Sequence, residues 1–133
     1  MSRDFHADGM LPPPDADFVW VFGSNMAGAH GGGAARVASE RYGARYGVGL
    51  GRTGNAYALP TLDELGRRLT VAQIAVQVAA FLDYARAHAN ERFWVTRVGC
   101  GIAGNADEDI APLFADAPAN CSLPDGWQAM MSG

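Results

Sequence analysis

The sequence contains no lysine, although it is 133 residues long. All ten basic residues are arginine, they face 14 acidic residues, and the formal net charge is -4 at pH 7. Nucleic-acid binding depends on a broad positive field that neutralises phosphate groups, and this composition does not supply one. A long nucleic acid is therefore not an expected partner.

Cysteines and long apolar runs are also scarce. Cys100 and Cys121 are too few for a disulfide scaffold, so both are expected to be free thiols. No apolar run is long enough to cross a bilayer, and residues 1–17 lack the basic start and apolar centre of a secretory signal. The sequence predicts a cytoplasmic protein that does not contact a membrane.

Patterns for a metal ion or a dinucleotide cofactor are missing. No metal-ligand spacing links the three histidines, which are His6, His30 and His88. The glycines of residues 99–104 have the spacing of a dinucleotide fingerprint, but that fingerprint opens the first βαβ unit and needs an acidic residue about 20 positions on. Position 124 is proline. We therefore expect neither a metal nor a cofactor.

The length and composition predict a single folded domain. Hydrophobic residues make up 49% of the chain and charged residues 18%, as in globular proteins. Residues 1–16, with three consecutive prolines, are interpreted as a tail or an edge-hugging lead-in, and residues 17–133 as the domain.

Strand and helix patterns alternate along the domain. Residues 18–22 are continuously apolar and β-prone, as in a strand buried on both faces, while Thr70 and Gln73 form a capping box at the start of an amphipathic helix. Asn105 and Glu108 are expected to cap a second helix in the same way. The predicted strands are residues 17–25, 46–50, 55–59 (ending at Pro60), 93–98 and 120–123, and the predicted helices are residues 33–42, 70–88 and 106–114. This order predicts an α/β domain of three layers, with a mainly parallel or mixed sheet, helices on both faces and ligands outside the carboxyl ends of the strands.

Glycine is abundant and clustered. Of the 17 glycines, 12 lie in residues 28–33, 43–54 and 99–104. Two of these clusters lie between a predicted strand and a predicted helix, where glycines let backbone N–H groups approach an anion and the helix start adds partial positive charge. Each cluster alone is as consistent with a tight turn as with a ligand site. Together, at one sheet edge, they predict a site that grips two ends of one ligand.

The order of these motifs resembles that of the macro domains, which bind ADP-ribose and related nucleotides. The matching motifs are a strand that ends at Asn25, the glycines of residues 31–33 followed by Ala34, the corner at residues 59–61, and the late run of residues 98–104. The branch that includes terminal ADP-ribose glycohydrolases is the most similar. The resemblance covers residues 19–114 and implies a macro-like fold.

The resemblance implies two ligand-binding loops. It places Asn25 and residues 31–33 around the distal ribose, and residues 99–104 around the diphosphate. The residues expected to bind the ligand are Gly23, Ser24, Asn25, His30, Gly31, Gly32, Gly33, Ala34, Thr61, Gly99, Cys100, Gly101, Ile102, Ala103 and Gly104.

The chain also departs from that branch. The lysine and aspartate that the hydrolases use are replaced by Leu62 and Ala103, so the lysine chemistry is not carried over. The aspartate that meets the adenine in the family has no clear match, since Asp15 and Asp17 lack its usual context.

Catalytic candidates are few. Asp63 is either a general base, together with its neighbour Glu64, or part of a solvated loop, and Asn25 either orients water or ribose or closes a strand end. Cys100 is interpreted as a packing thiol rather than a nucleophile, because no histidine pattern supplies a base. Arg97 either pairs with phosphate at the cleft rim or is solvated. Both Trp20 and Trp94 are interpreted as core residues.

Three functional hypotheses follow. In the first, the chain binds ADP-ribose or a related nucleotide metabolite between residues 23–34 and 99–104. In an enzymatic version of this hypothesis, the chain hydrolyses either an ADP-ribosyl bond, also on a modified protein, or a terminal phosphate. Asn25 and Asp63 are then the catalytic residues. In the second, it is a non-catalytic reader or sequestering protein for a nucleotide signal. In the third, it is a structural domain whose loops are only tight turns.

Overall fold

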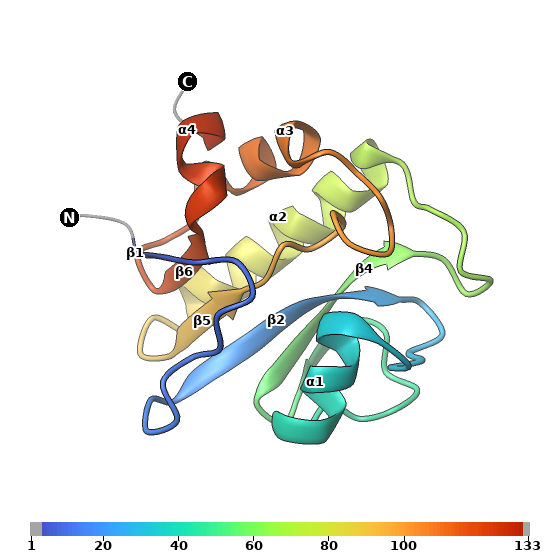
Figure 1. Ribbon diagram of the computed structural model, residues 1–133, viewed down its shortest axis with the longest axis horizontal. Coiled ribbons are helices and arrows are strands. Elements are labelled where there is room, and N and C mark those ends of the chain that lie inside the picture. Colours follow the sequence, from blue (N-terminus) through green and yellow to red (C-terminus); the bar gives the residue numbers. More distant parts are fainter. Residues whose placement is uncertain (1–3, 132–133) are drawn as a thin grey trace.

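The computed structural model describes residues 4–131, which form one mixed six-stranded sheet with helices on both faces (Figure 1). The strand order is β1-β6-β5-β2-β4-β3, and every neighbouring pair is parallel except β3 and β4. The elements are β1 (Asp4–His6), β2 (Phe18–Asn25), α1 (Gly33–Arg41), β3 (Gly51–Thr53), β4 (Ala56–Leu62), α2 (Val71–Ala87), β5 (Arg92–Val95), α3 (Asp107–Ile110), η1 (Ala111–Phe114), β6 (Cys121–Pro124), η2 (Asp125–Trp127) and α4 (Gln128–Met131). The predicted α/β class is confirmed.

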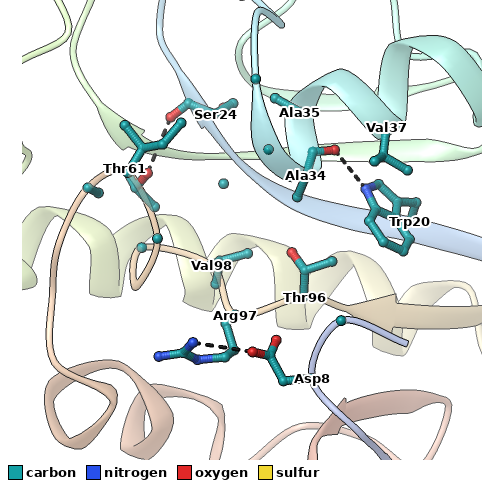
Figure 2. Close-up of a pocket in the computed structure, with 18 of the residues that line it drawn as sticks. Asp8, Trp20, Ser24, Ala34, Ala35, Val37, Thr61, Thr96, Arg97 and Val98 are labelled. Atoms are coloured by element: carbon teal, nitrogen blue, oxygen red, sulfur yellow. Dashed lines mark hydrogen bonds and ion pairs between the residues drawn. The ribbon is translucent and has the colours of Figure 1, made fainter. Parts of the chain in front are cut away.

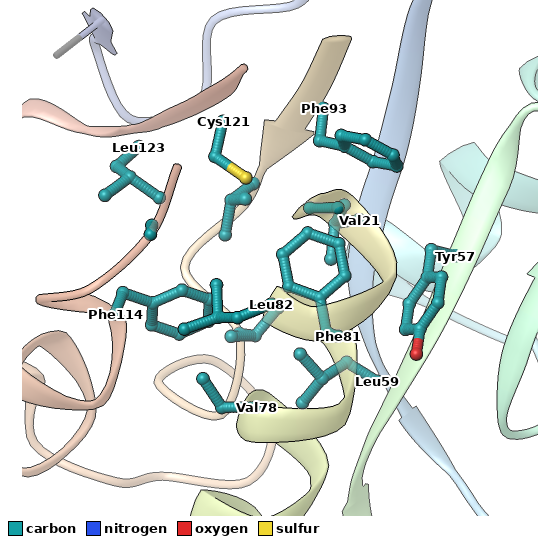
Figure 3. Packing of buried hydrophobic residues seen from close by; sticks show 14 of the residues in the cluster. Val21, Tyr57, Leu59, Val78, Phe81, Leu82, Phe93, Phe114, Cys121 and Leu123 are labelled. Atoms are coloured by element: carbon teal, nitrogen blue, oxygen red, sulfur yellow. The ribbon is translucent and has the colours of Figure 1, made fainter. Parts of the chain in front are cut away.

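Strand β2 separates two apolar layers because its side chains alternate between the two faces of the sheet. Val19 and Val21 pack in the larger core beneath α2, around Phe81 (Figure 3). Trp20 and Phe22 point to the opposite face and pack against α1. Residues 19–22 are buried on both faces of the sheet, which explains the continuously apolar sequence at the start of this central strand.

The N-terminal segment is part of the sheet. Strand β1 pairs in parallel with β6 at one edge, and His6 stacks on Trp94 with ring centroids 3.9 Å apart. The Nδ1 atom of His6 lies 2.8 Å from the Ser122 hydroxyl. Because residues 4–6 are tied to β6 by strand pairing and to β5 through His6, the chain that follows them is held close to the sheet.

Three predicted strands have clearly different bounds in the structure. The strand predicted at residues 93–98 is β5, which ends at Val95, so residues 96–98 belong to the loop that follows it. Residues 46–50 are not a strand; the short antiparallel strand β3 follows them at residues 51–53, after a glycine-rich turn. Strand β4 runs through Pro60 to Leu62 instead of ending at Leu59. The proline is tolerated because β3 pairs with β4 only as far as Ala58, so no donor is needed on that edge at Pro60. The edge is paired again only at Leu62, by an isolated bridge to Arg68.

Of the two capping boxes predicted at helix starts, one is present in the structure and the other is not. At α2, the Thr70 hydroxyl accepts from the Gln73 N–H and the Gln73 side chain accepts from the Thr70 N–H, so the capping box is confirmed. At α3, the expected Asn105–Glu108 box is wrong: the residue before the helix is Ala106, which makes no side-chain cap. Asn105 instead uses its amide elsewhere, in the loop that follows β5.

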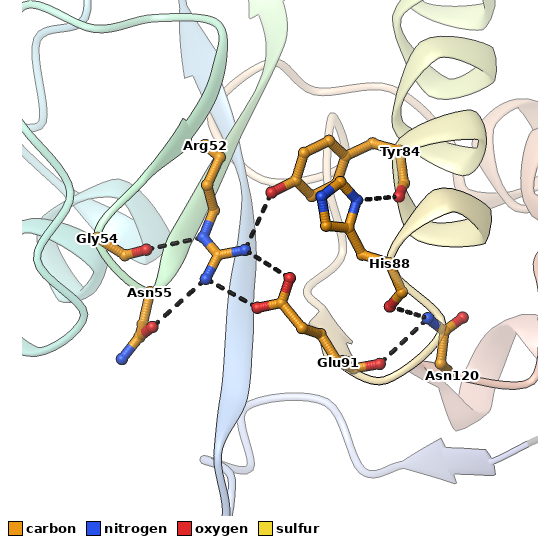
Figure 4. A network of polar contacts seen from close by, with 7 residues as sticks. All are labelled: Arg52, Gly54, Asn55, Tyr84, His88, Glu91 and Asn120. Carbon is orange, nitrogen blue, oxygen red and sulfur yellow. Dashed lines mark hydrogen bonds and ion pairs between the residues drawn. The ribbon is translucent and has the colours of Figure 1, made fainter.

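A polar network joins the amino ends of the strands, opposite the carboxyl ends where ligands were expected (Figure 4). The Arg52 guanidinium donates to the Glu91 carboxylate at 3.0 and 3.1 Å and to the Tyr84 hydroxyl at 3.0 Å. These hydrogen bonds from Arg52 hold the pKa of Glu91 below its usual value. The network links β3, α2 and the turn before β5, which is a structural role. Among the described residues no helix is long and apolar enough to cross a bilayer.

Candidate functional site

A cleft of about 640 Å³ lies at the carboxyl ends of β2, β4 and β5, on the face of the sheet that α1 covers (Figure 2). Strand β2 contributes Gly23, Ser24 and Asn25, and strand β4 contributes Thr61 and Leu62. The segment after β5 and the start of α1 complete the opening. The cleft is thus at the strand ends where the α/β topology leads one to expect it.

The cleft brings the two glycine loops together. Most of the expected ligand-binding residues line it: Gly23, Ser24, Asn25, Gly31, Gly32, Gly33, Ala34, Thr61, Gly99, Gly101, Ile102 and Ala103. His30, Cys100 and Gly104 lie outside the lining, although each adjoins a residue that is part of it.

The first loop is shaped by its own backbone contacts. The Asn25 amide donates to the Ala29 carbonyl and accepts from the Ala29 N–H, both at 3.1 Å, so it closes the turn that follows β2. Gly32 precedes α1 without any side-chain cap, which leaves the first N–H groups of the helix free for a ligand. Asn25 therefore has the strand-closing role that its alternative interpretation gave it, while it also lines the cleft.

The second loop is held from the inside by Asn105. The Gly99 carbonyl accepts from both the backbone and the side-chain N–H of Asn105, at 2.9 and 2.8 Å, and Arg68 donates to the Asn105 amide oxygen at 2.8 Å. Within residues 4–131, the N–H groups of Gly101, Ile102 and Ala103 have no hydrogen-bond acceptor. The bracing of Gly99 keeps these free donors in position beside the cleft.

The two loops face each other across the cleft. Ile102 is 81% exposed, and its Cδ1 atom lies 3.9 Å from the place where a Cβ atom would stand on Gly32 or Gly33. A side chain on either glycine would meet Ile102 at van der Waals distance. Glycine at these positions therefore keeps the passage between the loops open.

Asp63 lies outside the cleft. Its carboxylate accepts from the N–H groups of Leu65 and Arg67 at 2.9 and 2.8 Å and from the Arg67 guanidinium at 2.8 Å. The Arg67 N–H bond is the main cause of a pKa below the usual value for this carboxyl. Asp63 closes a surface loop, which is the alternative that the sequence left open.

His30 is buried beneath the first loop. It is 4% exposed, and its ring packs edge-on against Phe22 and Tyr46. Neither ring nitrogen has a partner among the described residues. The ring thus supports the glycine loop from below.

The Cys100 thiol is protonated at neutral pH. Burial, with a smaller contribution from the Asp107 carboxylate, raises its pKa to about 12. A group with a raised pKa becomes a thiolate only above that value, so the nucleophilic form is nearly absent at pH 8. The protonated state agrees with the interpretation of Cys100 as a packing thiol rather than a nucleophile.

Alkylation of Cys100 is expected to be slow. At pH 8, iodoacetamide should modify it about a hundredfold or more slowly than the same thiol in the protein unfolded in guanidinium chloride. Peptide-resolved mass spectrometry measures both rates. Equal rates in the folded and unfolded protein would contradict this picture of the thiol.

The sequence interpretation missed a segment that borders the cleft, which we call the N-terminal strap (residues 7–11). Asp8, Met10 and Leu11 line the cleft, and the Trp94 indole donates to the Met10 carbonyl at 3.2 Å. The Asp8 carboxylate pairs with Arg97 at 3.3 Å (Figure 2). No local pattern predicted this placement, because it depends on the pairing of β1 with a strand more than 100 residues away.

Arg97 lies on the cleft lining but is already paired. Its guanidinium donates to both oxygens of Asp107 at 3.0 and 2.8 Å, and the Trp127 indole donates to the same carboxylate at 2.7 Å. The Arg97 hydrogen bonds lower the pKa of Asp107 to about 2, so both groups stay charged at physiological pH. Asp107 thus anchors Arg97.

Two tryptophans border the end of the cleft beside the strap. Trp20 and Trp94 are partners in the β2–β5 register, so both point to the α1 face, and both are at most 5% exposed. They are core residues, as the sequence interpretation held, and they also line the cleft. Their equal parity in two neighbouring parallel strands is the signal that could have placed them together.

The cleft is suited to holding a ligand more than to transforming one. Among the acidic side chains that the structure describes, only Asp8 lines it, and no paired carboxylates or activated thiol face it. Among residues 4–131, no group of three or more His, Cys, Asp or Glu side chains could hold a metal ion. The available chemistry is hydrogen bonding from backbone N–H groups at the loops and apolar contact at the tryptophan end.

Comparison with known proteins adds no assignment: no family model matches the chain, and no curated protein matches it significantly.

Proposed function

We propose that this chain is a macro-like domain that binds ADP-ribose or a related nucleotide diphosphate in the cleft between its two glycine loops. The observation that carries the proposal is the set of unpaired backbone donors that border one cleft. They come from Gly101, Ile102 and Ala103 in one loop and from the uncapped start of α1 in the other. Such donors stabilise an anion without any cationic side chain, which suits a chain that has no lysine.

The chemistry of the cleft changes along its length in a way that suits a nucleotide. A diphosphate would lie between the glycine loops, with the distal ribose beside Asn25 and residues 31–33. The base would lie at the end bordered by Trp20, Trp94 and the strap, where the exposed side chains of Met10 and Leu11 offer apolar contact. There the Asp8 carboxylate is an acceptor for the exocyclic amine of adenine, which is the base's own donor. Asp8 would thus supply the contact for which Asp15 and Asp17 offered no clear match.

The same residues favour binding over hydrolysis. Asp63 is turned into its own loop, the Asn25 amide is occupied by Ala29, and the Cys100 thiol is protonated at neutral pH. The lysine and the aspartate of the similar hydrolase branch are replaced by Leu62 and Ala103. A reader or sequestering protein, for the free nucleotide or for an ADP-ribosylated protein, fits this set of side chains better than a glycohydrolase.

Gly101→Glu is expected to weaken binding strongly without unfolding the chain. Gly101 lines the cleft, has no positive φ, and would place a Cβ atom in open space with nothing within 4 Å. A carboxylate there would repel the diphosphate and weaken ADP-ribose binding by about a hundredfold. Isothermal titration calorimetry of wild type, Gly101→Glu and Gly101→Gln measures the effect.

The glutamine variant is the matched control, because it has the same size without the charge and should bind within about fivefold of wild type. Equal binding by the glutamate variant would contradict the loop assignment. If wild type gives no heat with ADP-ribose, ADP or ADP-ribose 1″-phosphate, the binding proposal fails. Release of free ADP-ribose from a modified protein at catalytic protein concentrations would instead favour the hydrolase.

A further inference from the structure

A second, smaller cavity adjoins the tryptophan end of the cleft. Its volume is about 240 Å³, and it lies between the strap and the segment after β6. Its lining residues are Asp8, Arg97, Asp107, Pro124, Asp125, Gly126 and Trp127. Asp8 and Arg97 line both the cleft and this cavity, so their ion pair stands at the boundary between the two.

The two members of this pair are held very differently. Arg97 is fixed by two hydrogen bonds to Asp107, which is itself held by the Trp127 indole. Among residues 4–131, the partner of the Asp8 carboxylate is Arg97, at 3.3 Å, and the Asp8 side chain is 58% exposed. Removing the Asp8 carboxylate would therefore open the boundary from the side of the strap, while Arg97 would keep its place.

We propose that the Asp8–Arg97 ion pair limits the size of the base that the cleft accepts, so that the chain binds a nucleotide with an unsubstituted exocyclic amine and excludes one with a bulky group there. This inference rests on the proposed nucleotide function. A carboxylate that accepts from the amine directs that amine toward the ion pair, and the 240 Å³ cavity lies behind it. Without the Asp8–Arg97 ion pair, the cleft and the smaller cavity would be joined, and a substituent on the amine would extend from one into the other.

The lining also sets which substituent the cavity would take. Three carboxylates, from Asp8, Asp107 and Asp125, face one guanidinium, so the cavity disfavours an anionic group. Trp127 and Pro124 form part of the wall, where both side chains are buried. An uncharged substituent such as benzyl therefore suits the space better than an anionic one.

The test compares ADP-ribose with ADP-ribose that carries a benzyl group on the exocyclic amine. Wild type should bind the benzyl compound about tenfold or more weakly. In Asp8→Ala, ADP-ribose should lose about tenfold in affinity with its carboxylate contact, while the benzyl compound should gain, so that the preference is reversed. Calorimetry with both compounds gives the ratio of dissociation constants, and thermal melting shows whether each variant is folded.

Two further variants serve as controls: one keeps the size of the Asp8 side chain but removes its charge, and the other removes a carboxylate elsewhere on the surface. Asp8→Asn keeps the bulk and an oxygen for Arg97, so it should still exclude the benzyl compound. Asp109→Ala removes an exposed carboxylate that lines neither cavity and should leave the wild-type preference unchanged. Equal binding of both compounds by wild type, or an unchanged ratio in folded Asp8→Ala, would overturn the inference even if ADP-ribose binding is real. Absence of binding to either compound by wild type would overturn the proposed function and this inference with it.

Discussion

Replacement of Gly28 by alanine is expected to lower the free energy of unfolding by about 3 kcal/mol or more, because two penalties add at this position. Gly28 has a φ of +74°, in the left-handed region that L residues enter at a cost. A Cβ atom there would also lie 2.3 Å from the Gly47 carbonyl carbon and from the Val48 nitrogen. Both contacts are to backbone, so no side-chain rotation relieves them.

The same change should disturb the cleft, because the turn that it strains also carries Asn25. The Gly28 N–H donates to the Asn25 carbonyl at 3.0 Å, and the Gly28 carbonyl accepts from Gly47 at 2.8 Å. We therefore expect weaker ADP-ribose binding in any Gly28→Ala protein that still folds. Chemical denaturation and calorimetry measure the two effects separately.

Gly31→Ala is the matched control in the same loop. Gly31 has no positive φ, and a Cβ atom added to it would have nothing within 4 Å. Its stability should stay within about 0.5 kcal/mol of wild type. A Gly28→Ala protein as stable as Gly31→Ala would show that the loop is not packed as described.

Replacement of Phe81 by alanine is expected to cost about 3–5 kcal/mol of stability, since it removes a large side chain from the centre of the core beneath the sheet. Phe81 is fully buried in α2, and its ring meets Tyr57, Phe93 and Phe114 at centroid distances of 5.0, 5.6 and 6.5 Å (Figure 3). These partners come from β4, β5 and η1. The cavity would therefore loosen the attachment of α2 to the sheet.

Urea denaturation of Phe81→Ala, with Val76→Ala beside it, measures this cost. Val76 lies in the same helix but is 67% exposed, so its truncation should change stability by less than about 0.5 kcal/mol. A loss below about 1 kcal/mol for Phe81→Ala would mean that this ring is not central to the core.

Local sequence patterns predicted the elements whose shape depends on neighbouring residues. Residues 18–22 of β2 are continuously apolar because both faces of the strand are covered, and α2 begins directly after Thr70 because the capping box acts within four residues. Where a distant strand decides the outcome, the local pattern was insufficient. Residues 46–50 have strand-like composition, yet the partner edge of β4 is reached only at Gly51.

The candidate site was also predicted from the sequence only in part. Both glycine loops were predicted, since glycine clusters between a strand and a helix are visible in the sequence, and the structure brings most of their residues to one cleft. The position of Asp63 in the sequence made it a plausible catalytic carboxylate, but hydrogen bonds to Arg67 turn its side chain into its own loop. The Asn105 side chain left its expected capping role because the Gly99 carbonyl competes for the amide.

The sequence by itself determined the α/β class, the two free thiols, the central strand and the position of both glycine loops, because each of these depends on composition or on residues close in the chain. Only the tertiary structure decided that the strap, Trp20, Trp94 and Arg97 share the cleft, and that Asp8 faces Arg97 across 89 positions. Those placements depend on parallel strand pairing and on which face of the sheet each side chain takes. The alternation of side chains within one strand is visible in the sequence, but contacts between segments far apart in the chain decide which strands pair and which face each side chain takes. Local periodicity alone therefore does not encode these placements.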